Sequence, residues 1–353
     1  MNSKALSYEY YYNKDGSKDK FAHLLASCID APTYLIAKNM YKNLDDFYSI
    51  YLNDITICIS LKSNGMIHNV WGNNVKSIRI FDFAKYEKKG KDAASFIEQL
   101  LDNQELVMVS TVYQMLPFSD HYDPHFDINR FKPSHVFLIV SYDYDSYYYV
   151  DSETVINKKN FVSYDGNKDI GIIKKDILLS ALNVYCEIYT IKLNNNNLQD
   201  IKTSVDKIIF QCYKNYHKCY EEIDGKIVLY GYEAINKLID ISNKKQCLVD
   251  ETYLNGLNLY QLLNWKLWDM HNRRKILFEC VRTKLINEDN KYDEQLISII
   301  SDCGDAWQLV RNVITKRYIN NLYEINGFLS KYFIWIRSLE DKLNICLQRL
   351  LDL

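Results

Sequence analysis

The sequence lacks any long hydrophobic run and any secretory signal. No stretch reaches the roughly 18 uncharged apolar residues that a membrane-spanning helix needs. Residues 1–20 are largely polar and contain no apolar segment of the kind found in signal peptides. Both absences argue against a membrane protein and against secretion, so we expect a cytoplasmic protein that does not associate with membranes.

An excess of charge of either sign is also missing. The chain has 43 lysines and arginines against 45 aspartates and glutamates, which gives a formal net charge of −2. Such a balance provides no field that would attract nucleic acid or an anionic membrane. We therefore expect neither of them as a partner.

Paired-cysteine motifs are absent as well. The nine cysteines are an odd number and occur without a CxxC pair, which argues against a zinc ribbon or a redox-active dithiol. In a reducing compartment most of them are expected to be small buried hydrophobic residues. A cysteine with a chemical role must therefore be identified from its own surroundings.

The sequence does contain two regions of different texture. A length of 353 residues favours two domains. A polar tract of asparagines at 194–197 lies between an N-terminal region rich in short apolar runs and a C-terminal region with helical spacing of apolar residues. We predict one domain at residues 1–193 and a second at residues 198–353.

The N-terminal region carries strand signals and one helix signal. The segments 106–113 and 135–142 are continuous apolar runs of strand length, as expected for buried strands. Residues 146–150 predict a return strand after a turn at 143–145. A helix-like segment opens at about residues 28–39. This pattern predicts an α+β domain.

The C-terminal region predicts a helical bundle. Apolar residues recur there at helical spacing over long stretches that contain almost no proline or glycine. The expected helices lie at about residues 201–221, 257–286, 292–314 and 320–351.

Three residues of the N-terminal region match the parts of a thiol enzyme, which needs a cysteine, a partner imidazole and a group that orients the imidazole. Cys28 precedes a helix, whose dipole favours a thiolate. His135 opens one predicted strand and Asp151 follows the next, so a tight hairpin would bring the carboxylate to the ring. We predict a catalytic triad; the alternatives are a buried cysteine, a strand-capping histidine and a turn aspartate.

The same two strands resemble a known family. Residues 134–143 (SHVFLIVSYD) and 149–152 (YVDS) are similar to the histidine–aspartate region of the butirosin biosynthesis protein H family. The chain also resembles the cysteine-protease homologue that forms amide bonds in closthioamide assembly. The likeness extends over about residues 20–155. It implies a papain-like N-terminal domain, with an antiparallel sheet and a cysteine-bearing helix, followed by a mostly helical domain.

This resemblance also implies a function in antibiotic biosynthesis of the nonribosomal type. A cysteine-dependent acyltransferase would move an acyl group from a carrier-protein thioester through Cys28 to an amine, forming an amide. The implied partners are an acyl or peptidyl carrier protein, whose phosphopantetheine carries the substrate, and a small amine acceptor. The enzyme itself would need no cofactor.

One departure from papain-type proteases concerns the oxyanion hole. Those proteases have an upstream glutamine that donates to the oxyanion, whereas this chain has Ala22 at that position. The backbone N–H of Cys28 and a second donor would replace it, with His23, Asn39 and Gln114 as candidates. The departure disfavours a peptidase or amidase with the same triad, which stays the alternative together with an inactive papain-like binding protein.

Two further clusters attract attention. The segment 120–127 (DHYDPHFD) contains His121 and His125 among carboxylates. The two histidines stand in a proline-containing loop and not on a helix face, so we expect no metal there. A surface loop that borders the cleft and holds the amine acceptor fits better. The pair Arg273-Arg274 is expected on a solvated helix face, with docking of an acidic carrier protein as the alternative.

Overall fold

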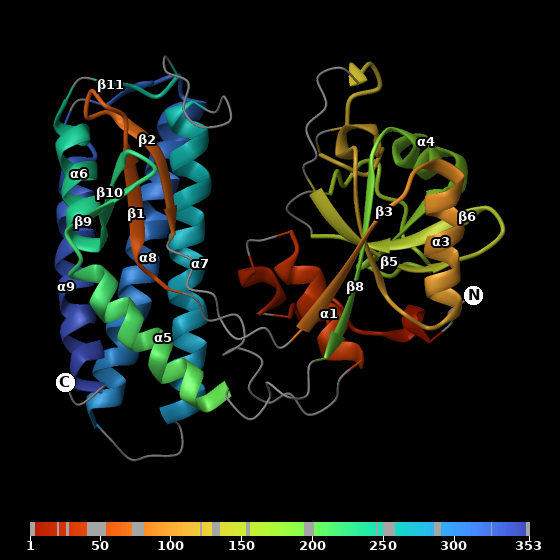
Figure 1. The fold of residues 1–353 in the computed structure, drawn as a ribbon, viewed down its shortest axis with the longest axis horizontal. Helices are drawn as coiled ribbons and strands as arrows, with labels where there is room; N and C mark the ends of the chain where they lie inside the picture. Colours follow the sequence, from red (N-terminus) through yellow and green to blue (C-terminus); the bar gives the residue numbers. More distant parts are fainter. Residues whose placement is uncertain are drawn as a thin grey trace. The chain divides into compact units, whose positions relative to one another are not determined.

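The chain divides into two compact units. One consists of Met1–Asp45 and Arg79–Asn196, and the other of Asp46–Ile78 and Asn197–Leu353. The structure is a computed structural model (Figure 1). It describes residues 4–19, 21–25, 28–40, 54–72, 81–120, 122–128, 135–152, 156–193, 201–244, 246–249, 258–285, 291–325 and 327–350.

The first unit contains an antiparallel sheet of six strands. Their order in the sheet is β3-β8-β4-β5-β6-β7, and each neighbouring pair is antiparallel. The strands are β3 Phe81–Glu87, β4 Val107–Thr111, β5 His135–Tyr142, β6 Ser146–Val150, β7 Ile170–Lys174 and β8 Cys186–Leu193. The central β4 and β5 are buried because both of their faces are covered, which is why they read as continuous apolar runs.

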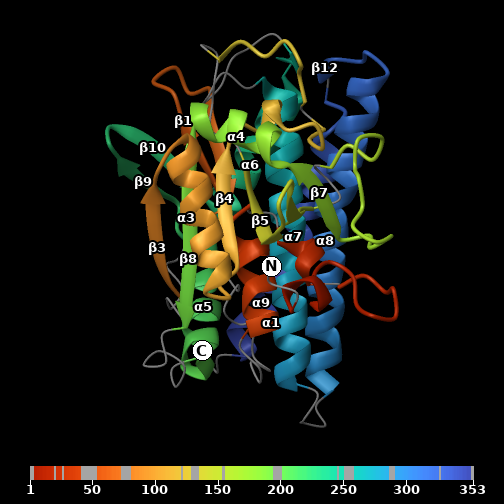
Figure 2. The ribbon, with the colours of Figure 1, turned by 90° about the vertical axis from the view of Figure 1, so that its right-hand side faces the viewer.

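Two helices cover one face of this sheet. Helix α3, Gly90–Asp102, and helix α4, Lys175–Val184, pack against each other and against the strands. Ala93, Ile97 and Leu101 place an apolar stripe of α3 on the sheet, as a helical period of 3.6 residues requires. Figure 2 looks onto this face, with α3 in front of the strands.

The opposite face of the sheet carries α1, Asp30–Met40. Val107 and Val109 of β4 belong to the core under α3 and α4. Met108, which lies between them, points the other way, and its sulfur is 3.7 Å from Oγ1 of Thr33 in α1. Three short 3-10 helices complete the unit: η1 Ala5–Ser7, η2 Ala22–Leu24 and η3 Tyr113–Met115.

The second unit is mainly helical, as predicted. Its helices are α5 Ile201–Tyr216, α6 Gly231–Asn243, α7 Leu259–Leu285, α8 Lys291–Ile319 and α9 Ser330–Leu350. Helix α8 packs against both α7 and α9, and α6 and α5 pack against α9. A small β11–β12 pair, Gln246–Cys247 and Glu324–Ile325, adds two short strands.

This unit also contains a four-stranded sheet that the sequence patterns did not predict. Its strands are β1 Ile57–Leu61, β2 Ile67–Gly72, β9 Tyr220–Ile223 and β10 Lys226–Tyr230, in the order β2-β1-β10-β9. β1 pairs with β10 across a long stretch of sequence, with Cys58 opposite Tyr230. Because of this pairing, residues 46–78 belong to the second unit and not to a continuous first domain at 1–193. The predicted boundary needs that correction.

A buried ion pair lies among the helices of the second unit. Nε of Arg274 in α7 is 2.6 Å from Oε1 of Glu340 in α9, and the two side chains are 1% and 2% exposed. Nε1 of Trp307 in α8 donates to the same carboxylate oxygen at 2.7 Å. The carboxylate therefore connects three helices, and its charge is compensated inside the core.

Candidate active site

His135 and Asp151 form a hydrogen-bonded pair at one end of the first unit's sheet. Nε2 of His135 lies 2.8 Å from Oδ1 and 3.0 Å from Oδ2 of Asp151. The carboxylate is nearly sealed, with 3% of its side chain exposed, whereas the imidazole keeps 13%. Asp151 is thus buried, whereas the imidazole of His135 is still accessible.

Strand pairing explains why these two residues meet. β5 and β6 pair with Leu138 opposite Val150, so Asp151 continues β6 toward the beginning of β5, where His135 lies. Its backbone then leaves the sheet, and the N–H of Ser152 donates to Oδ1 at 2.7 Å. The predicted hairpin geometry, with its ends brought together, is confirmed.

A third side chain, Tyr113, joins the pair. β4 aligns Thr111 opposite His135, and the chain then turns into η3, which brings Tyr113 over the imidazole. The two rings lie 4.4 Å apart at an angle of 46°. The Tyr113 hydroxyl donates to Oδ2 of Asp151 at 3.0 Å. Burial, followed by the charge of Asp151, raises the pKa of Tyr113, which keeps the phenol protonated as a donor.

Cys28 lies beside Val136, the residue that follows His135 in β5. It stands in the turn two residues before α1 and is partly buried. Hydrogen bonds from the backbone of Val136 and from its own backbone lower the pKa of the thiol, so the sulfur lies next to the start of β5. The Nε2 side of the imidazole is taken by Asp151. The other ring nitrogen, Nδ1, is therefore the one left for exchanging a proton with a thiol.

The resting form of Cys28 differs from our expectation. Burial is the largest influence on its pKa and raises it above the ordinary thiol value, and the charges of Asp151 and Asp30 raise it further. The backbone hydrogen bonds do not outweigh these effects. The raised pKa favours the neutral thiol, so a base must take the proton of Cys28 when it reacts.

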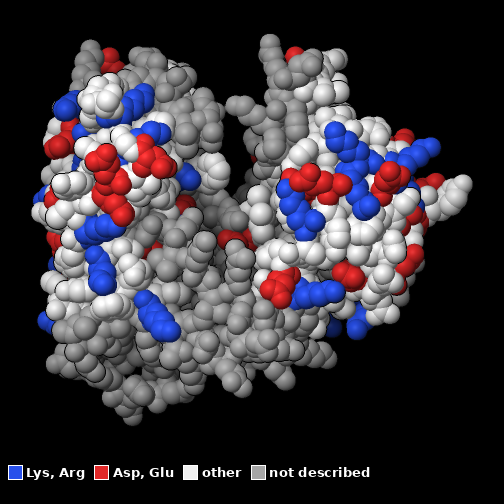
Figure 3. All heavy atoms as spheres, viewed as in Figure 1, with Lys and Arg blue, Asp and Glu red and all other residues white. Residues whose placement is uncertain are grey.

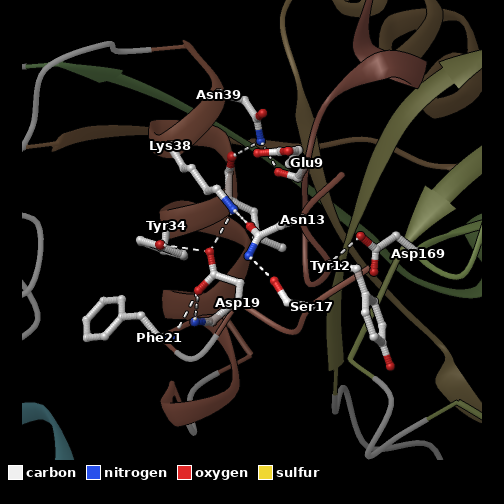
Figure 4. Close-up of polar contacts among 12 residues, drawn as sticks. Glu9, Tyr12, Asn13, Ser17, Asp19, Phe21, Tyr34, Lys38, Asn39 and Asp169 are labelled. Carbon is white, nitrogen blue, oxygen red and sulfur yellow. Dashed lines mark hydrogen bonds and ion pairs between the residues drawn. The ribbon is translucent and has the colours of Figure 1, made fainter. Parts of the chain in front are cut away.

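The position of α1, and with it the approach to Cys28, depends on a buried aspartate (Figure 4). Oδ1 of Asp19 accepts from the backbone N–H groups of Phe21 and Ala22 at 2.9 and 3.0 Å. Its Oδ2 accepts from the Tyr34 hydroxyl at 3.0 Å and from Nζ of Lys38 at 2.7 Å. Asp19 thereby connects the segment before Cys28 to two turns of the helix that follows it.

Tyr11 lies near the same centre. Its side chain is 3% exposed, and burial, followed by the charges of Asp151 and Asp169, raises its pKa. The ionisation of Cys28 and a side-chain hydrogen bond with Ser152 also influence it. Tyr11 and Tyr113 are aromatic neighbours of the site that sequence reasoning missed. Both occur in tyrosine-rich or apolar segments, and only the tertiary structure distinguishes them from the other tyrosines.

His23 is poorly suited to donate to an oxyanion. Burial is the main cause that lowers its pKa, so the ring is neutral, and its ring hydrogen bond is to the backbone of Tyr11. Nε2 of His23 is buried and has no hydrogen-bond partner. When Nδ1 carries the proton for Tyr11, Nε2 presents a lone pair and accepts. The structure therefore disfavours this candidate.

The side chain of Asn39 has a structural role. Its side-chain nitrogen donates to the carbonyl oxygens of Glu9 and Leu35, both at 2.8 Å (Figure 4). Both amide hydrogens are used in these bonds, and Asn39 stands near the C-terminal end of α1, whereas Cys28 precedes its start. Asn39 fixes the N-terminal segment onto the helix and does not belong to an oxyanion hole.

Gln114 remains the candidate that lies nearest to the pair. It directly follows Tyr113 in η3, it is partly buried, and its Oε1 is buried without a hydrogen-bond partner. An oxyanion needs a donor, which in Gln114 is the side-chain nitrogen and not this oxygen. Together with the backbone N–H of Cys28, Gln114 is the remaining proposal for oxyanion stabilisation.

The segment 120–127 is described only in part. His121 lies outside the described residues, and His125 is exposed, with its backbone N–H bonded to Oδ1 of Asp123 at 2.9 Å. Across the part of the chain that the structure describes, no group of three histidine, cysteine, aspartate or glutamate side chains could hold a metal ion. Nothing places His125 at Cys28.

The pair Arg273-Arg274 does not form a solvated face. Arg274 is buried in its ion pair with Glu340. Nη1 of Arg273 donates to the carbonyl oxygen of Asp54 at 2.6 Å, and its Nε lies 3.0 Å from Oδ2 of Asp269. Both guanidinium groups support the second unit, which removes them as a docking point for an acidic carrier protein.

Charge on the visible surface is mixed, as the composition suggested. On the face in Figure 3, lysines and arginines alternate with aspartates and glutamates over both units. Within the described ranges, no helix is sufficiently long and apolar to span a bilayer.

Comparison with known proteins adds no assignment. No model of a protein family matches the chain, and no characterised protein matches it significantly in sequence. The geometry of the site and the resemblance in the two strands are therefore the features that support a function.

Proposed function

We propose that this protein is a cysteine-dependent acyltransferase of papain-like architecture that forms amides, with Cys28 as nucleophile. The observation that carries the proposal is the His135–Asp151 pair at the start of β5, with the thiol of Cys28 beside the next residue, Val136. A basic ring held by a carboxylate next to a cysteine is the arrangement that activates a thiol. The order of the three residues along the chain supports the papain-like assignment.

The first half of the reaction would acylate the cysteine. Nδ1 of His135 accepts the proton of Cys28 while the sulfur attacks the carbonyl carbon of a thioester. The tetrahedral oxyanion then collapses, the bond to the pantetheine sulfur breaks, and His135 returns the proton to the leaving thiolate. Asp151 keeps the ring in the Nε2–H form throughout. One thioester replaces another, so this step is nearly balanced in free energy.

The second half would form the amide. An amine attacks the acyl-Cys28 carbonyl, His135 takes a proton from the attacking nitrogen, and the cysteine sulfur leaves and is reprotonated. The resemblance in the two strands suggests that the donor is an acyl or peptidyl carrier protein in nonribosomal-type antibiotic biosynthesis. A small amine would be the acceptor.

Hydrolysis by the same triad is the competing enzymatic reaction. A peptidase of this type needs a strong oxyanion donor upstream of the cysteine. Ala22 has no polar side chain, and the arrangement of His23 offers an acceptor. Acyl transfer from a thioester to an amine is less demanding than peptide cleavage, because a thioester carbonyl is already activated. These features favour acyl transfer.

Intact-protein mass spectrometry tests the proposal. Incubation with an acyl-pantetheine thioester is expected to add one acyl group to the wild type and none to Cys28→Ala. The exposed Cys219 provides the matched control, because Cys219→Ala should acylate like the wild type. Absence of an adduct on Cys28 would refute the proposal and leave a binding protein.

The acceptor is tested on the acylated protein. Addition of a diamine or an amino sugar should release the acyl group as an amide faster than buffer alone releases it as the acid. Release only as the acid, at a rate that does not depend on the amine, would identify a hydrolase.

A further inference from the structure

The carboxylate of Asp151 is held by more donors than the imidazole alone. Oδ1 accepts from the backbone N–H of Ser152, at 2.7 Å, and faces Nε2 of His135 at 2.8 Å. Oδ2 accepts from the hydroxyl of Tyr113 at 3.0 Å. A carboxylate bonded at both oxygens cannot rotate freely about its side chain, so its direction toward the ring is fixed.

Tyr113 acts on both members of the pair at once. Its hydroxyl holds Asp151, while its ring lies 4.4 Å from the ring of His135. Tyr113 itself is 2% exposed and packs against Phe118, with ring centroids 6.0 Å apart, in the core under α3 and α4. It thus connects the core to the pair at the end of strands β5 and β6.

From this geometry we infer that Tyr113 is a positioning residue of the site, which fixes Asp151 and the imidazole of His135 in the orientation that serves Cys28. The inference deepens the proposed function and rests on it. Tyr113 touches no reacting atom and acts through Asp151, so its hydroxyl should matter only while that carboxylate is present.

Tyr149 offers a matched control. It is as deeply buried as Tyr113, and its ring stacks on the same Phe118 at a centroid distance of 3.9 Å. It stands two residues before Asp151, yet its hydroxyl has no hydrogen-bond partner. Tyr149→Phe therefore removes a buried hydroxyl from the same core without breaking a hydrogen bond to the pair.

The first measurement is the rate constant for acylation of Cys28 by an acyl-pantetheine thioester at saturation. Tyr113→Phe should lower it on the order of tenfold, since a hydrogen bond to a charged group is lost. The thioester concentration at half-saturation should not change, and Tyr149→Phe should stay within about twofold of wild type. In an Asp151→Ala background, Tyr113→Phe should have no further effect.

A second measurement does not depend on activity. The proton on Nε2 of His135, assigned by its loss in His135→Gln, should give a downfield NMR resonance that exchanges slowly with water. Tyr113→Phe should accelerate this exchange, and Tyr149→Phe should not.

The outcomes separate the two proposals. Unchanged proton exchange in Tyr113→Phe overturns the positioning role, as does an unchanged acylation rate or an equal loss in the Asp151→Ala background. If the wild type forms no acyl adduct while the exchange responds as expected, the positioning role stands and the proposed function fails.

Discussion

The two units contain similar carboxylate clusters with different properties. In the first, Asp151 accepts from Tyr113 and faces the imidazole of His135. In the second, Glu340 accepts from Trp307 and from the guanidinium of Arg274. Each cluster therefore combines one carboxylate, one aromatic donor and one basic group.

The two clusters differ in their basic group, which is a guanidinium in the second unit and an imidazole in the first. A guanidinium stays charged at every pH that a protein survives, and Arg274 is 1% exposed, so the second cluster has nothing to exchange with substrate. The imidazole of His135 keeps an exposed edge beside a thiol, with which it can exchange a proton. The same hydrogen-bonding pattern stabilises a fold in one unit and is suited to chemistry in the other.

The largest expected effect comes from breaking the cluster of the second unit. Glu340→Gln leaves the buried charge of Arg274 uncompensated and should lower the free energy of unfolding by about 3–5 kcal/mol. All five tryptophans lie in the second unit, so urea unfolding followed by tryptophan fluorescence reports on that unit.

A neighbouring ion pair serves as the control. Nζ of Lys275 in α7 lies 2.8 Å from Oδ1 of Asp305 in α8, but the Asp305 side chain is 65% exposed. Asp305→Asn should change the unfolding free energy by about 0–1 kcal/mol. Equal losses in both variants would mean that burial does not distinguish the two pairs.

The next effect concerns Asp19, a buried carboxylate of the first unit that has a structural role. Asp19→Asn removes the charge that pairs with Lys38 and should destabilise the unit by about 1.5–3 kcal/mol. Hydrogen exchange of the α1 amides, measured by mass spectrometry, should accelerate. Unchanged exchange would show that Asp19 does not hold α1 in place.

The raised pKa of Cys28 predicts a pH dependence. Below its pKa a thiol is mostly neutral, so the thiolate fraction and the rate of alkylation by iodoacetamide should rise about tenfold per pH unit between roughly pH 6.5 and 8.5. Glutathione measured alongside should reach its plateau at lower pH. A rate for Cys28 that is flat from pH 6 to 8 would instead indicate a resting thiolate–imidazolium pair.

The smallest effect is expected at Asn39. Asn39→Ala removes the two hydrogen bonds to Glu9 and Leu35 and should destabilise the first unit by about 1 kcal/mol. The acylation rate of Cys28 should stay within about twofold of wild type. A loss of about a hundredfold without a change in stability would instead make Asn39 an oxyanion donor.

Local signals predicted the hairpin of the first unit well. The strands at 135–142 and 146–150 match β5 and β6 at both ends, because a continuous apolar run bounded by polar turn residues has few alternatives. The long helices α7 and α8 were predicted for a similar reason.

Two segments of the second unit escaped this reasoning. Asp224 and Gly225 have φ values of 51° and 70°, the left-handed pair of a tight hairpin turn, and this Asp-Gly signal was available in the sequence. The pairing of β1 with β10 had no local signal, because the two strands lie far apart in the chain.

The features of the candidate site likewise fall into those set by local sequence and those set by the tertiary structure. The sequence by itself determined the order of Cys28, His135 and Asp151, and the hairpin between the last two, since strand and turn propensities act over a few residues. Only the tertiary structure decided the raised pKa of Cys28, the hydrogen bond of Tyr113 to Asp151 and the structural use of Asn39 and Arg274. Burial and hydrogen-bond partners set these properties, and both depend on residues that are distant in the chain.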